Sequence, residues 1–143
     1  MRKRIHRNSG QRGNAVIEVA LMTPGIFFLF AGILDVDFYN YALIATQNAA
    51  RTAVEYTSRS ATTAADSTGA CTFALDHLNG MSNVRSLTTC NASPLVVTAN
   101  AVTDADGYAA ASVSVTYTTS NLVPIPGVKG QVSMTRTVQM MLR

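Results

Sequence analysis

The residues best suited to chemistry lie near the start of this 143-residue sequence. Glu18 stands inside an apolar run, where an ionised side chain costs about 2.5–3.5 kcal/mol. Cleavage of the chain after Gly13 would create a free amine at Asn14 and make Glu18 the fifth residue of the shortened chain. An ammonium and a carboxylate attract strongly in a medium of low dielectric, and each offsets the desolvation of the other. We therefore expect Gly13 and Asn14 to form a processing site and Glu18 to pair with an amine. The alternative is a Glu18 that lies at the level of the lipid headgroups.

A basic leader precedes this glycine. Five of the eleven cations of the chain stand within the first twelve residues, and these are Arg2, Lys3, Arg4, Arg7 and Arg12. Cleavage after Gly10 would leave Arg12 in the apolar segment and put Ala15 at the fifth position, so Gly10 is the poorer site. The rest of the chain holds six cations and eight acids, so it lacks the basic face that a nucleic-acid partner requires.

Residues 15–34 form an apolar segment of twenty residues, which as a helix crosses a hydrocarbon core of about 30 Å. The cations before it, with Asp35 and Asp37 after it, predict a cytoplasmic N-terminus and a C-terminal part outside. A cleaved secretory signal is the rival interpretation, but residues 34–39 offer no small residues for its cleavage site. A membrane anchor that stays with the chain is therefore the favoured interpretation.

The stretch over residues 13–25, GNAVIEVALMTPG, resembles the opening of the TadE-like family, the pilin-like proteins of the tight-adherence (Tad/Flp) type IV pilus system. A basic leader, a glycine and a hydrophobic helix with Glu at the fifth position form the wider pattern of type IV pilins and pseudopilins. The QNAAR segment at residues 47–51 matches the end of the family's alanine-rich segment, and the similarity covers residues 13–56. Val19, where an aromatic residue often stands, and the acids just past the span depart from the pattern.

The resemblance implies a minor pilin or pseudopilin that takes part in the assembly of a bacterial Tad-type pilus or a related secretion filament. A prepilin peptidase would cut after Gly13, and Glu18 would contact the Asn14 amine of a neighbouring subunit. Other pilin-like subunits and the pilus assembly platform are the further partners implied. The subunit would wait in the inner (cytoplasmic) membrane as a single-pass protein with its head outside the cytoplasm. A single-pass anchored binding module that does not polymerise is the alternative from a different class of function.

One helix is expected over residues 14–57, with its first half in the membrane. Pro24 interrupts the span, either as a tolerated kink or as a bend or melted turn that lets subunits pack. Beyond the span, an alanine-rich stripe follows helical spacing, and we expect it to pack against the protein's own body. The stripe consists of Phe38, Ala42, Ala45, Ala49, Ala53 and Tyr56.

The remaining residues predict a small head, which together with the helix gives a pilin-like fold of the α+β class. Residues 58–70 are rich in Ser, Thr and Ala and indicate a loop, which a short helix over residues 73–78 follows. Cys71 and Cys90, the only cysteines, are expected to form a disulfide outside the cytoplasm, with two free buried thiols as the alternative. Alternating patterns predict about three antiparallel strands against the helix. The strands lie at residues 95–102, 112–118 and 131–142, and the turn after the first lies at residues 104–107.

Four segments result: a leader (1–13), a transmembrane half-helix (14–34), an extracytoplasmic half-helix (35–57) and a head (58–143). Charged residues make up 13% of the chain, against about 25% in soluble globular proteins, which argues against a cytosolic enzyme. The sequence has no glycine-rich phosphate loop, GxSxG or HExxH motif. We therefore expect no catalytic residue, metal, cofactor or small-molecule substrate. The apolar loop at residues 124–128 is either a partner contact or a plug under the sheet.

Overall fold

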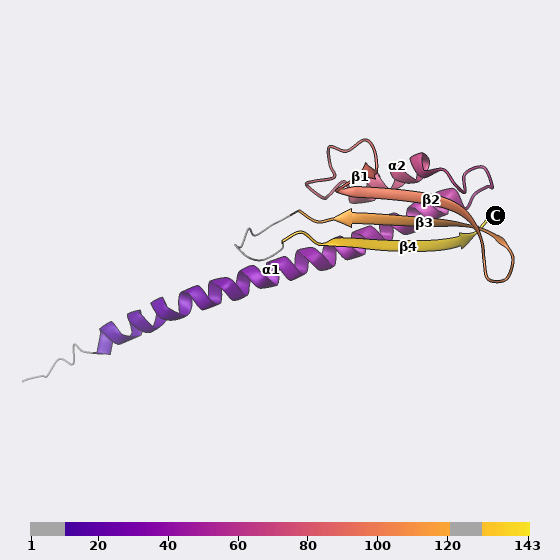
Figure 1. Cartoon of the computed structure of the whole chain (residues 1–143). Coiled ribbons are helices and arrows are strands. Elements are labelled where there is room, and N and C mark those ends of the chain that lie inside the picture. The colour runs from indigo at the N-terminus through magenta and orange to yellow at the C-terminus, as the bar shows by residue number, and fades with distance from the viewer. Residues whose placement is uncertain (1–10, 121–129) are drawn as a thin grey trace, which may run out of the picture. The chain divides into compact units, whose positions relative to one another are not determined.

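The computed structural model describes residues 11–120 and 130–143 (Figure 1). Most of the basic leader and the apolar loop at residues 124–128 lie outside the described residues. The chain divides into two compact units, of which the first ends at Val36 and the second begins at Asp37. Helix α1 contributes to both units.

Helix α1 (Gln11–Thr57) confirms the single helix expected over residues 14–57. The alanine-rich stretch in its second half favours this conformation, since alanine has no side-chain freedom to lose in a helix. The helix ends at Thr57, where side-chain hydroxyls satisfy carbonyls of its last turn. Thr57 Oγ1 donates to the carbonyl of Val54 at 3.2 Å, and Ser58 Oγ donates to the carbonyl of Glu55 at 3.2 Å.

Helix α2 (Ser67–Leu78) begins earlier than the expected helix over residues 73–78, so the loop expected over residues 58–70 is wrong in its last part. Asp66 caps the helix, because its carboxylate accepts the N–H groups of Thr68 at 3.1 Å and Gly69 at 2.9 Å. An aspartate followed by Ser and Thr is common both in loops and at the start of helices. Composition alone therefore does not separate the two.

Four antiparallel strands form one sheet in the order β1-β2-β3-β4. They are β1 (Asn91–Ala92), β2 (Leu95–Thr103), β3 (Ala109–Thr118) and β4 (Ser133–Met141). The last three confirm the expected strands, whereas β1 is too short to show an alternating pattern. The expected turn between β2 and β3 is also present. Gly107 has a φ of 84° there, and its N–H donates to the carbonyl of Asp104 at 2.9 Å.

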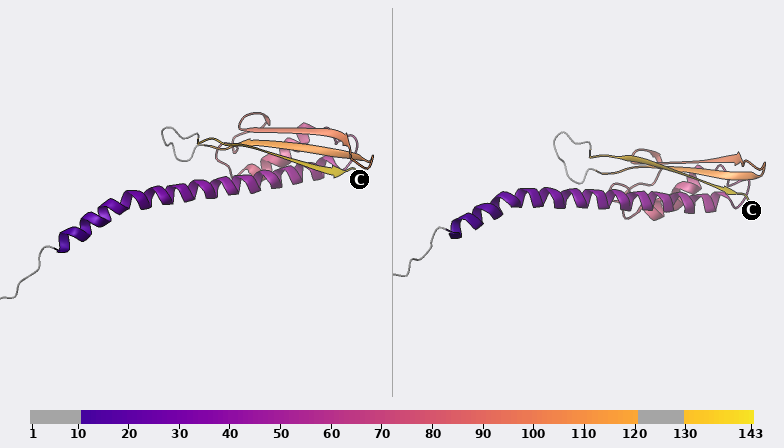
Figure 2. Two further views of the ribbon diagram at one scale, coloured as in Figure 1. Left: turned by 60° about the horizontal axis from the view of Figure 1, so that its bottom comes forward. Right: turned by 90° about the horizontal axis from the view of Figure 1, so that it is seen from below.

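The core of the second unit lies between the inner face of the sheet and the helices. In both views of Figure 2, α2 and the C-terminal half of α1 lie on the same side of the sheet. Along β3, Val113, Val115 and Tyr117 are fully buried and alternate with half-buried hydroxyl residues. On α1, Ala42 and Ala49 of the alanine stripe are also fully buried, so the stripe packs against the protein's own body as expected.

A long apolar N-terminal helix that packs against a four-stranded antiparallel sheet is a pilin-like architecture of the α+β class. The expected fold class is confirmed, with a fourth short strand added at the edge of the sheet.

Candidate functional site

The first unit of the chain is an apolar helix with nearly all of its side chains exposed. From residue 15 to residue 36, Ala31 alone is partly buried. The large apolar side chains are 51–81% exposed and surround the helix on all sides. They are Val16, Ile17, Val19, Leu21, Met22, Ile26, Phe27, Phe28, Leu29, Phe30, Ile33, Leu34 and Val36. A helix that is apolar all round requires apolar surroundings, either lipid or other protein.

Helix α1 is the one helix among the described residues that is long and apolar enough to cross a membrane. Its most apolar window of eighteen residues has a mean hydropathy of 2.0, and none of that window is buried. Length and composition carry this assignment, and a signal sequence near an N-terminus shares both properties. The segment is therefore suited to a membrane by its physical character.

Glu18 is the single charged residue between residues 15 and 34, and its side chain is exposed. Leu21 and Met22 share its face of the helix and are apolar. The sequence has no Lys, Arg or His from residue 14 to residue 50. Residues 14–50 therefore offer Glu18 no cationic side chain.

Gly13 and Asn14 lie in the first turn of α1. Asn14 precedes Glu18 by four residues, which corresponds to about 6 Å of rise along the helix axis. A parallel copy displaced by about one helical turn would therefore bring an amine at its Asn14 level with Glu18. Cleavage after Gly13 and this pairing remain predictions.

Helix α1 continues through Pro24 without a break. Pro24 has no N–H to donate to the carbonyl of Ala20, one turn earlier. Beside it, Thr23 Oγ1 donates to the carbonyl of Val19 at 2.7 Å. The chain is therefore helical at this proline, while a bend or melted turn that lets subunits pack, and a subunit contact at Pro24, remain predictions. A shallow apolar groove of about 380 Å³ adjoins it, lined by Thr23, Ile26, Phe27 and Phe30.

Comparisons with protein-family models, with curated proteins and with solved structures found no match. The pilin-like architecture therefore rests on the fold, in which α1 is apolar at its N-terminal end and packs on the sheet within the second unit. Any assignment to a particular class of pilin-like subunit rests on the residue pattern around Gly13 and Glu18.

Cys71 and Cys90 form a disulfide, as expected, so the alternative of two free thiols is wrong. Cys71 lies on α2 and Cys90 directly precedes β1, and both are buried. The bond therefore ties α2 to the edge of the sheet. Disulfides form and persist in oxidising compartments, so this bond supports a head outside the cytoplasm.

A cluster around Tyr56 joins the end of α1 to the start of α2. The Tyr56 hydroxyl donates to Asp66 Oδ2 at 2.7 Å, and its ring stacks on Phe73 with centroids 4.8 Å apart. The Arg59 guanidinium lies 5.9 Å from the centroid of the Tyr56 ring. The Gly69 N–H and the Tyr56 hydroxyl hold the pKa of Asp66 below its usual value, while the bond to Asp66 and burial raise the pKa of Tyr56. In the sequence Tyr56 belongs to the alanine stripe, and no local pattern there indicates this cluster.

Gly69 is expected to tolerate no side chain. A Cβ atom at this position would overlap the ring of Tyr56 and the carboxylate of Asp66. Gly69→Ala should therefore lower the free energy of unfolding by about 1–3 kcal/mol, seen as a lower thermal midpoint of the full chain in detergent. Gly80→Ala is the matched control, because its Cβ would meet only the Tyr41 hydroxyl, at 3.3 Å. Equal midpoints for Gly69→Ala and the wild type would contradict the close contact.

The Asp66 cap is expected to make the folded state sensitive to acid. Because folding lowers the pKa of Asp66, its carboxylate stabilises the fold at pH values above its ordinary pKa of 3.8. This stabilisation is lost as the pH falls through the lowered pKa. Between about pH 5 and pH 2, the thermal midpoint of the wild type should fall more steeply than that of Asp66→Asn, measured by circular dichroism. Parallel curves for the two proteins would show that the cap does not govern the acid response.

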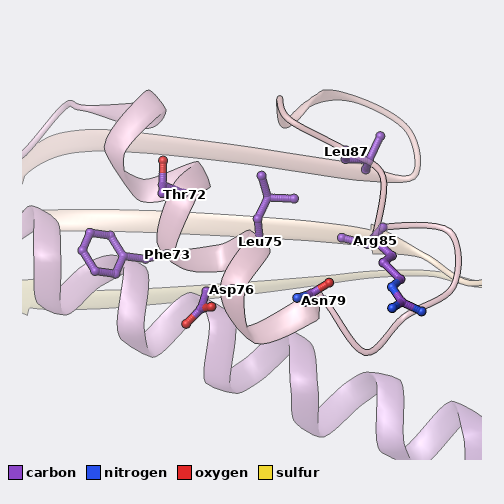
Figure 3. A pocket seen from close by; sticks show the side chains of 8 residues that line it. Thr72, Phe73, Leu75, Asp76, Asn79, Arg85 and Leu87 are labelled. Carbon is purple, nitrogen blue, oxygen red and sulfur yellow. The ribbon is translucent and has the colours of Figure 1, made fainter.

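A shallow cleft of about 400 Å³ lies beside α2 (Figure 3). Leu75 and Leu87 point to one side in that view, and the charged Asp76 and Arg85 point to the other. The lining is completed by Thr72, Phe73, Asn79 and Val84. The cleft offers one carboxylate and one guanidinium but no histidine or cysteine. Among residues 11–120 and 130–143, no three His, Cys, Asp or Glu side chains gather as metal ligands.

Proposed function

We propose that this chain is a pilin-like subunit of the TadE-like type, a minor pilin or pseudopilin, that takes part in the assembly of a Tad-type pilus or related secretion filament. One observation carries the proposal: the N-terminal part of α1 is apolar on all sides and contains a single carboxylate, Glu18. Lipid satisfies the apolar surface of a separate subunit, and neighbouring α1 helices satisfy it in a filament. A plain membrane anchor has no need of the carboxylate.

The proposed steps from cleavage to assembly follow from this exposed apolar surface of α1. Residues 1–13 are the leader that a prepilin peptidase removes, and residues 14–34 hold the subunit in the inner membrane. Residues 35–57 and the head over residues 58–143 lie outside the cytoplasm, where the Cys71–Cys90 disulfide forms. The assembly platform then transfers the subunit from lipid into contact with other pilin-like subunits. The chain carries out no catalysis and uses no cofactor in this role.

Glu18 and the Asn14 amine set the position of neighbouring subunits. In lipid or in a filament core, each charge alone is poorly solvated, and pairing with the opposite charge relieves both. The two groups meet when parallel α1 helices are displaced by about one helical turn, or about 6 Å. Apolar contacts between the helices supply attraction without fixing register, so the charge pair supplies the register.

Substitution of the leader glycine tests this proposal. Gly13→Leu should abolish cleavage and leave the chain in the membrane at its full length, because the new side chain stands directly before the cut. Gly10→Leu is the matched control, since it makes the same change in the same leader and should be cleaved normally. The readouts are the intact mass and the amount of protein in filaments sheared from the cell surface. Filaments formed by the uncut Gly13→Leu chain would contradict the proposal, and a leader that is never removed would favour the anchored binding module.

A further inference from the structure

We propose that a groove on the second unit binds the Asp37 carboxylate of a second copy of this chain. This groove, the Arg51–Arg136 groove, lies between α1 and β4 and has a volume of about 570 Å³. Its lining residues are Leu43, Ile44, Gln47, Asn48, Arg51 and Arg136. The inference rests on the proposed filament and adds the contact between the heads.

The lining of the groove is suited to a carboxylate. Arg51 and Arg136 bring two guanidinium groups, and Gln47 and Asn48 add amide donors, whereas no acid is among the lining residues. Guanidinium groups present several N–H donors in a plane and bind carboxylates through paired hydrogen bonds. An anion in this groove would therefore be bound by charge and by directed hydrogen bonds together.

The position of Arg136 also indicates a missing partner. Arg136 occupies an inward-facing position of β4, between the buried Met134 and the half-buried Val138, and is itself half-buried. Its Nη1 donates to the carbonyl of Thr135 at 3.3 Å, a long bond that leaves most of its donors for other groups. A half-buried cation at an inward-facing position is stabilised by an anion, and the groove is where that anion can approach it.

The acid that fits is on the same face of α1 as Arg51. Five exposed residues follow each other along this face at spacings of three and four residues. They are Asp37, Tyr41, Ile44, Asn48 and Arg51. From residue 14 to residue 50 the chain contains three acids and no cation, so Arg51 is the first cation of the body. Between Asp37 and Arg51 this face therefore has its negative charge toward the N-terminus and its positive charge toward the C-terminus, and the exposed carboxylate of Glu55 follows one turn beyond Arg51.

Two parallel copies can pair these charges. Asp37 and Arg51 are fourteen residues apart, which corresponds to about 21 Å along the helix axis. A copy displaced by that distance brings its Asp37 level with Arg51 of the first copy, next to the groove. Tyr41 and Ile44, which are 56% and 60% exposed, add apolar surface beside this contact. The displacement exceeds the ~6 Å of the Glu18–Asn14 contact, so the two contacts join different pairs of neighbours in a helical array.

Charge exchange tests the proposed contact. Asp37→Arg and Arg51→Glu should each reduce the amount of protein in sheared filaments about tenfold, because each brings like charges together at the groove. The double variant restores opposite charges and should recover filament protein to within about threefold of the wild type. Arg85→Glu is the matched control, since it reverses an exposed arginine of the head outside the groove and should leave filaments unchanged. Double variants no better than the single variants would overturn the proposal.

Cross-linking gives a second, direct readout. The two native cysteines are joined to each other, so newly introduced cysteines are the only free thiols. In filaments of Asp37→Cys/Arg51→Cys, oxidation should produce covalent dimers and longer ladders. The same chain cannot bridge these positions, since both lie on one helix about 21 Å apart. Asp37→Cys/Arg85→Cys is the control, and ladders of equal yield in the two variants would overturn the assigned contact.

The outcomes separate this inference from the proposed function. If the wild type is cleaved to Asn14 and forms filaments, but the charge exchange fails to restore assembly, the groove contact is wrong and the proposed function stands. If the wild type is neither cleaved nor found in filaments, the proposed function and this inference are both wrong. The thermal midpoints of the single variants, which alter exposed residues, should match the wild type.

Discussion

Glu18→Ala is expected to leave cleavage after Gly13 intact and to reduce filament-bound protein about tenfold or more, because the Asn14 amine of a neighbouring subunit then lies in an apolar environment without a counter-charge. Cleavage occurs before assembly, at a bond five residues away, and needs no pairing between subunits. The variant should therefore accumulate in the membrane as the shortened chain. Immunoblots of membranes and of sheared filaments measure both steps.

Two matched variants separate the effect of the Glu18 charge on assembly from the effect of side-chain shape. Glu18→Gln keeps the size and polarity of the side chain but loses the charge, so it should assemble as poorly as Glu18→Ala. Val19→Ala truncates the adjacent exposed apolar residue and should assemble close to the wild-type level. Normal filaments from Glu18→Gln would contradict the charge pair, because only the charge distinguishes that variant from the wild type.

The Cys71→Ala/Cys90→Ala variant is expected to show the largest loss of stability in the head. The disulfide joins cysteines that are nineteen positions apart in the sequence, and its removal should cost about 3 kcal/mol of unfolding free energy. For a unit of this size, the loss corresponds to a thermal midpoint lower by about 10 °C or more. Melting of the full chain in detergent, followed by circular dichroism, measures the change.

Reduction provides the control for this variant. Wild-type protein treated with dithiothreitol should melt at the temperature of the double variant, and the double variant should not respond to the reductant. A midpoint that is the same in all samples would contradict a stabilising role for the disulfide. The same melts without reductant show whether protein extracted from the cell carries the bond.

Local patterns were sufficient to predict the main elements of the fold. Helix α1 has an apolar segment and an alanine stripe, and β3 alternates valine and tyrosine with hydroxyl residues. Residues close together in the sequence are therefore enough to predict these two elements. The start of α2 depends on Asp66 as a cap, and the same short polar sequence also occurs in loops. Strand β1 is two residues long and is defined by its pairing with β2 instead of by its own composition. The cap is a local contact that residue types alone do not distinguish from a loop, whereas β1 depends on contacts with another part of the chain.

The residues of the candidate site likewise divide into those that the sequence alone indicates and those that only the fold brings together. Gly13 and Glu18 are only five residues apart in sequence, so their types and spacing are sufficient to propose a cut and a charge pair. The Tyr56 cluster joins residues from two helices, and the Arg51–Arg136 groove joins a helix to the last strand. No local pattern links Arg51 to Arg136, and only the fold of the second unit brings them to one groove.

The N-terminal residue and intact mass of the chain extracted from membranes, with and without the prepilin peptidase, test the central claim most directly. The proposed function predicts a chain that begins at Asn14 when the peptidase is present and a full-length chain when it is absent. A chain that keeps its leader in the presence of the peptidase would contradict the proposal. Glu18 would then have no new amine to pair with, and the protein would be an anchored module that does not polymerise.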